Sequence, residues 1–101
     1  MPELTCTARR IGDLESRTEE YELTFSVEGG ETKALEIKYQ AARAYEINRG
    51  LDAAVETARE AISSADLDKR PTDESLAQFA WRALQSVKYE EGSPKTSALE
   101  L

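Results

Sequence analysis

The sequence predicts an α+β fold: a three-stranded antiparallel sheet, formed by the N-terminal part, with two or three helices packed on one face. Apolar and polar residues alternate with a period of two over residues 21–39, which is typical of half-buried strands. From residue 40 the apolar residues recur at helical spacing, and a second helical stripe follows residue 72. The 101 residues are enough for one modest core. We therefore predict a single domain over residues 1–89.

Residues 21–39 are typical of a β-hairpin. A two-residue turn at Gly29-Gly30 would place the two apolar rows on opposite faces of the sheet. We therefore predict an odd-length loop with a glycine bulge. Slipping this register by two residues would set Glu22 against Glu36, which we disfavour because like charges repel. The predicted cross-strand pairs are Phe25–Leu35, Leu23–Ile37, Tyr21–Tyr39 and, on the outer face, Glu22–Lys38.

We predict a strand at the N-terminal end of the chain and a flexible tail at the C-terminal end. Leu4, Cys6 and Ala8 alternate with polar residues, so we predict a first strand over about residues 3–10, with Cys6 buried as a small hydrophobic residue. At the other end, Gly92-Ser93-Pro94 ends the last helix, and we predict a flexible C-terminal tail over residues 90–101.

The two helical stripes differ in bulk. The first is rich in alanine, and Gly50 either ends a first helix or lies inside one continuous helix; we favour a break or kink. The second helix should begin after Thr72, a typical N-terminal cap. The apolar residues of the first stripe are Ala44, Ile47, Leu51, Ala54, Val55, Ala58 and Ile62. Those of the second are Leu76, Phe79, Ala80, Ala83, Leu84 and Val87.

Composition argues against catalysis and against bound cofactors. The chain has no histidine, which removes the commonest general base and the commonest metal ligand. Its one cysteine cannot form an internal disulfide. Asp66 and Asp68 resemble the start of a calcium loop, but Arg70 and Pro71 stand where a ligand and a glycine are required. We predict no catalytic residue, no cofactor and no metal.

Further features of the sequence concern the cellular location of the protein and its contacts with membranes and nucleic acid. No apolar run approaches membrane-spanning length, and the first three residues lack the basic start of a secretory signal, so we expect a cytoplasmic protein. Arg9-Arg10 and Lys69-Arg70 are isolated basic pairs, too few for a phosphate-binding stripe. We expect no contact with a membrane and no direct contact with nucleic acid.

The net charge of −7 is concentrated on the hairpin and on the loop before it. Residues 13–36 hold eight acidic and two basic residues. One interpretation is a solvated outer sheet face that resists edge pairing. The other is a surface that meets a basic partner. Its candidate residues are Glu19, Glu20, Glu22 and Glu36.

Aromatic residues on the helices indicate a second candidate surface. Trp81 stands beside the main stripe of the last helix, next to Leu84, and would form an exposed apolar patch there. We predict self-association, a homodimer, through this patch; alternatively, Trp81 covers the edge of a small core. The candidate protein-interaction residues are Trp81, Tyr45, Tyr89 and Leu84.

The segments AARAYEINRGLD and SLAQFAWRAL, which follow an acidic hairpin, resemble the small tail-assembly chaperones of tailed phages. In this likeness the match is carried by Glu46 to Gly50 and by Leu76, Phe79, Trp81 and Leu84. It implies a non-enzymatic protein that shields helical segments of a larger assembly protein and that self-associates. The alternative is an acidic phage inhibitor of the anti-CRISPR or anti-restriction type, which imitates nucleic acid and binds a host DNA-binding complex. A third interpretation is a housekeeping subunit with an obligate partner.

Overall fold

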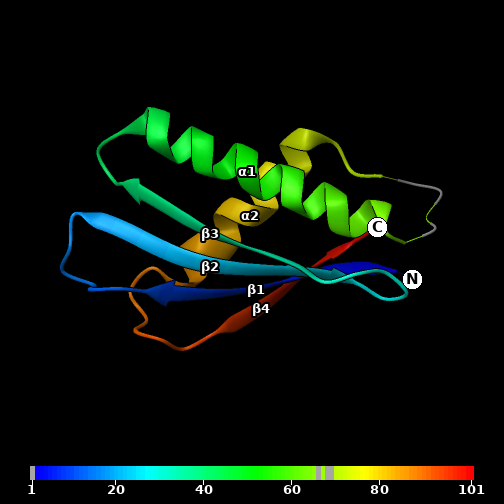
Figure 1. The fold of residues 1–101 in the computed structure, drawn as a ribbon, viewed down its shortest axis with the longest axis horizontal. Coiled ribbons are helices and arrows are strands. Elements are labelled where there is room, and N and C mark those ends of the chain that lie inside the picture. The colour runs from blue at the N-terminus through cyan, green and yellow to red at the C-terminus, as the bar shows by residue number, and fades with distance from the viewer. Residues whose placement is uncertain (1, 66, 68–69) are drawn as a thin grey trace.

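The computed structural model describes residues 2–65, 67 and 70–101 and shows an α+β fold with one antiparallel sheet and two helices. The loop aspartates Asp66 and Asp68 lie outside the described residues. Along the chain the elements are β1 (Glu3–Ile11), β2 (Thr18–Val27), β3 (Lys33–Gln40), α1 (Ala44–Ser63), α2 (Asp73–Val87) and β4 (Lys95–Glu100). Figure 1 shows α1 running along β3, while α2 crosses behind the sheet.

The sheet has four strands, in the order β3-β2-β1-β4, so the prediction of three strands was wrong. The fourth strand comes from the segment that we expected to be a tail. It pairs antiparallel with β1 over six residue pairs, from Glu3 opposite Glu100 to Ala8 opposite Lys95. The Leu101 amide also donates to the Pro2 carbonyl at 3.0 Å, which joins the two ends of the chain. A strand as short as β4 is hard to recognise from its own sequence, because its identity as a strand depends on its pairing with β1.

The hairpin adopts the register that we disfavoured. Leu23 faces Leu35 and Tyr21 faces Ile37, so both apolar rows lie on one face as the odd-length loop required. Glu22 nevertheless faces Glu36. The reason lies in β1, whose Arg9 sits opposite Glu22 on its other side and forms an ion pair with it at 3.3 Å. The counter-ion for Glu22 comes from the neighbouring strand and not from Lys38.

Helix α1 is continuous through Gly50, so the predicted break is wrong. Glycine is required there by close approach to the sheet: a Cβ atom built on Gly50 would lie 2.7 Å from Cγ2 of Ile37. Helix α2 begins where expected, and the Thr72 hydroxyl accepts a hydrogen bond from the Ser75 amide at 3.1 Å. The glycine therefore fixes how closely α1 packs on β3.

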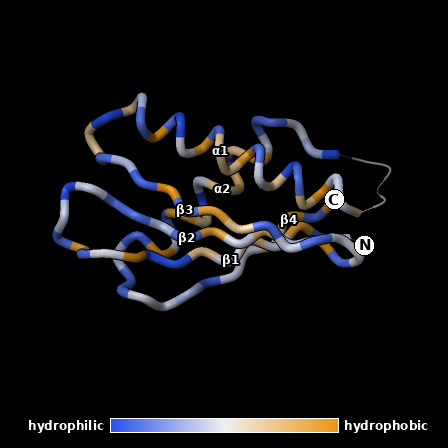
Figure 2. The backbone as a smooth tube through the Cα atoms, viewed as in Figure 1, coloured by the Kyte–Doolittle hydropathy of each residue, from blue (hydrophilic) through white to orange (hydrophobic). Residues whose placement is uncertain are grey.

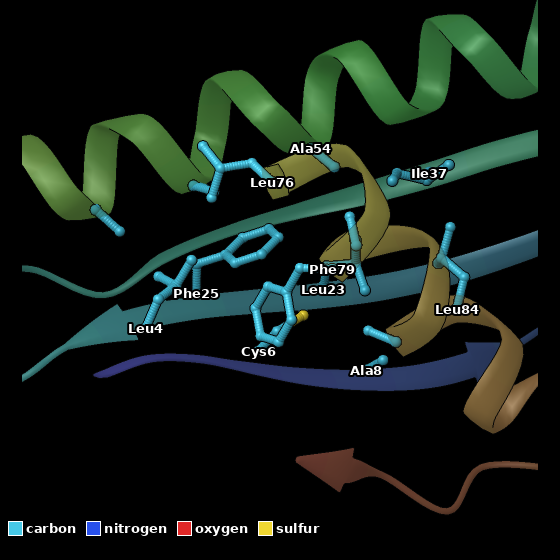
Figure 3. Close-up of a cluster of buried hydrophobic side chains, with 14 of the residues drawn as sticks. Leu4, Cys6, Ala8, Leu23, Phe25, Ile37, Ala54, Leu76, Phe79 and Leu84 are labelled. Carbon is cyan, nitrogen blue, oxygen red and sulfur yellow. The ribbon is translucent and has the colours of Figure 1, made fainter. Parts of the chain in front are cut away.

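The core lies between one face of the sheet and both helices, and Figure 3 shows side chains from all of these elements pointing into it. All six predicted residues of the α2 stripe are buried, whereas the buried residues of α1 are Ala54, Ala58, Ala61 and Ile62. Cys6 is fully buried, as predicted. Hydrophobic residues recur along the strands and both helices (Figure 2). None of the described helices is long and apolar enough to span a membrane.

Candidate functional site

An open groove of about 410 Å³ lies between the first half of α1 and the middle of α2. We call it the helical groove. Ile47 and Leu51 of α1 line it and are half-buried, and Trp81 of α2 is 36 % exposed. Its lining residues are Ala44, Ile47, Asn48, Leu51, Ala77, Gln78 and Trp81. The lining is mainly apolar and offers contact surface without titratable groups.

A second open groove, of about 480 Å³, continues along the seam between the helices and shares Ala77 with the first. This acidic end of the seam is lined by Asp52, Val55, Glu56, Arg59, Asp73, Glu74 and Ala77. Arg59 is occupied, because its guanidinium donates to the Asp73 carboxylate at 2.6 Å and to the Pro71 carbonyl at 3.0 Å. The seam therefore runs from an apolar half to a half with excess negative charge.

Of the four residues predicted to form the protein-interaction patch, only Trp81 lines the helical groove. Leu84 is fully buried in the core and is not accessible to a partner. Tyr45 and Tyr89 are largely exposed, at 71 % and 82 %, and lie outside the groove lining. A cation lies over one face of each ring, Arg49 at 5.7 Å and Lys88 at 5.4 Å from the ring centroids.

Ile47 and Leu51 were missed as site residues, because sequence reasoning assigned the whole α1 stripe to the core. One signal was present. Ala44, Ile47 and Leu51 recur at the start of the helix, before the alanines that the structure buries fully. A stripe that begins ahead of the buried segment has more apolar surface than the sheet can cover. That surplus forms the groove.

The four acidic residues do not form one exposed row. Glu20, Glu22 and Glu36 lie on the outer face of the sheet, whereas Glu19 lies on the inner face and is only 5 % exposed. Glu22 pairs with Arg9, and Glu20 lies 4.0 Å from the Lys38 amine. Among the residues that the structure describes, no cation lies within ion-pair distance of Glu36. The outer face is therefore partly neutralised by its own cations.

Glu19 belongs to a buried polar cluster at the end of the sheet where Arg10, Tyr21 and Tyr39 meet. The Tyr21 hydroxyl donates to Glu19 Oε1 at 2.5 Å, and the Arg10 guanidinium lies 5.4 Å from the Tyr21 ring and donates to the Lys88 carbonyl at 2.6 Å. Burial raises the pKa of Tyr21 well above its usual range, and the hydrogen bond to Glu19 raises it further. This cluster ties α2 to β1 and is closed to ligands.

Within the described ranges, no group of three or more His, Cys, Asp and Glu residues is placed to hold a metal ion. Comparisons with protein-family models, curated proteins and solved structures find no match to this chain. The helical groove, with the acidic end of the seam beside it, is therefore the candidate site on geometry alone.

Proposed function

We propose that this chain is a small, non-enzymatic protein-binding module that holds a helix of another protein in the helical groove. The supporting observation is an open apolar groove with Trp81, the chain's one tryptophan, on its wall. Tryptophan is the residue most enriched among those that dominate binding energy at protein interfaces. The lack of histidine in the sequence also favours binding over catalysis.

An amphipathic helix is the occupant that suits this shape. Two helices already form the walls, and a third can lay its apolar face between them with anchors spaced three and four residues apart. Because the negative charge lies at one end of the seam, it favours one orientation of the bound helix. The acidic end, with Asp52, Glu56 and Glu74, favours lysine or arginine on the partner beyond its apolar anchors.

This role agrees with the resemblance to phage tail-assembly chaperones, for which shielding helices of an assembly protein is the implied activity. We place the protein in the cytoplasm. The single cysteine, which leaves no internal disulfide, supports that location. The alternative, a mimic of nucleic acid, would use Glu20, Glu22 and Glu36 on the outer face, where two of the three have cations nearby.

The two roles are separated by binding measurements on the purified, identified partner at low and high salt. Truncating Trp81 to alanine should weaken binding by about 30-fold or more, equivalent to roughly 2 kcal/mol. Replacing Glu20, Glu22 and Glu36 together by glutamine should leave affinity nearly unchanged. Single exposed charges contribute little, but a whole row would steer a basic partner and make binding depend on salt.

Tyr89→Ala is the matched control, since this ring is more exposed than Trp81 and lies outside the groove. It should bind like the parent. If the glutamine triple variant loses binding while Trp81→Ala keeps it, the acidic face is the active surface and the groove proposal fails.

A further inference from the structure

Strand β3 is one edge of the sheet, and its outer side chains alternate in charge. Glu36 and Lys38 both point to the outer face, on either side of the inward-facing Ile37. A groove of about 370 Å³ lies between this part of the strand and α1, so the middle of the edge is open. Glu46, Arg49, Gly50 and Ala53 line the helix side of that groove, and Glu46 Oε1 accepts a hydrogen bond from the Gln40 amide at 3.4 Å at the end of the strand. The free backbone groups of an edge strand can pair with another strand there.

Among the residues that the structure describes, neither Glu36 nor Lys38 has a close partner of opposite charge. Glu36 faces Glu22, whose own counter-ion is Arg9, and Glu36 has no ion-pair partner among the described residues. Lys38 has a 70 % exposed side chain, and its amine reaches Glu20 only at 4.0 Å. An opposite charge placed beside each would improve the electrostatics of this edge.

We propose that a second copy of this chain supplies those charges, by antiparallel pairing of β3 with β3 across a two-fold axis at Ile37. In this register Glu36 of each copy faces Lys38 of the other, twice per dimer and on the same face of the sheet. Moving the axis to Glu36 would set two glutamates against each other, and moving it to Lys38 would set two lysines together. Like charges directly opposite are destabilising, so both of these registers are disfavoured, and the axis at Ile37 is the one that pairs Glu36 with Lys38.

The other edge of the sheet offers no such match. In β4 the two charged residues are Lys95 and Glu100, and they point to opposite faces because their positions differ by an odd number. They cannot face each other in any antiparallel pairing of β4 with itself in a continuous sheet. The Lys95 amine also forms an ion pair with Glu90 Oε1 at 2.5 Å. The self-complementary edge is therefore β3, and pairing there would extend the sheet from four strands to eight.

This inference does not depend on the proposed function. The helical groove lies between α1 and α2, whereas the β3 edge lies between α1 and solvent. Self-association through the apolar patch at Trp81, which the sequence predicts, would give a different dimer. The two dimers respond to different substitutions.

Charge swapping tests the proposal, with oligomeric state measured by sedimentation equilibrium at micromolar concentrations. The parent should dimerise. Glu36→Lys and Lys38→Glu should each raise the dimer dissociation constant by about tenfold or more, because each turns two attractive pairs into repulsive ones. An equimolar mixture of the two variants should form heterodimers, since one copy then presents two positive side chains and the other two negative ones. Glu100→Lys, the same reversal on the outer face of β4, is the control and should dimerise like the parent.

Circular dichroism should show that all of these surface variants are folded. A parent that stays monomeric up to a few hundred micromolar would overturn the proposal. It would equally be overturned if the mixture of the two reversed variants does not associate, or if Trp81→Ala abolishes dimerisation while the charge reversals leave it intact.

Discussion

Replacing Tyr21 and Tyr39 by phenylalanine, one at a time, removes the same atom from two stacked rings with centroids 5.8 Å apart. The two hydroxyl groups are in opposite situations. That of Tyr21 donates to the buried Glu19 at 2.5 Å, whereas that of Tyr39 is buried and has no hydrogen-bond partner among the described residues. Tyr21→Phe should therefore destabilise the fold by roughly 1.5–3 kcal/mol, the usual loss for a hydrogen bond to a charged group.

Tyr39→Phe should be neutral or stabilise the fold by up to about 1 kcal/mol, because it removes a buried polar atom that makes no bond. Urea unfolding followed by circular dichroism measures both changes, and an unchanged denaturant slope would show that the unfolded state is unaffected. The gap between the two variants should be at least about 1.5 kcal/mol. Equal losses, or a larger loss for Tyr39→Phe, would refute this account of the cluster.

Two further predictions concern packing and pH. Gly50→Ala should lower stability by about 1 kcal/mol, because overpacking against Ile37 costs more than the gain in helix propensity; Ile37→Leu, which removes the contacting methyl group, should reduce the loss, and urea unfolding of the double variant checks this. Burial raises the pKa of Cys6 from 9.0 to about 12 and also raises the pKa of Tyr21 and Tyr39. These groups stabilise the fold fully below about pH 9. As the pH rises further, the unfolded chain ionises first and stability falls by about 1.4 kcal/mol per pH unit per group. A Cys6→Ala variant whose stability falls as steeply as the parent's between pH 9 and 10 would contradict this.

Sequence periodicity identified the fold class, the three long strands and the apolar face of α2, because each of these is set by local alternation. It could not identify the register of the hairpin. That register depends on Arg9, which comes from a strand on the far side of β2. It could not identify β4 either, since Leu99 alone gives a six-residue segment little apolar pattern. Pairing between distant segments decides both.

The candidate site was predicted only in part. Trp81 was singled out because it stands beside a clear stripe, and it does line the groove. Glu19 was placed with the exposed acids by its charge, although it shares the parity of the inward-facing Tyr21. The position of Glu19 in the strand alternation predicts its burial better than its charge does, because a carboxylate can be buried where a tyrosine hydroxyl donates to it.

The central claim, that a partner occupies the helical groove, can be tested on one side chain. Because the chain has one tryptophan, labelling with 5-fluorotryptophan gives a single ¹⁹F resonance, from Trp81. Titration with the unlabelled partner should shift this resonance and protect it from a soluble paramagnetic quencher, since the ring is 36 % exposed in the free chain and would become covered. If the partner binds, as measured calorimetrically on the same sample, and the resonance neither moves nor gains protection, the groove is not the binding surface.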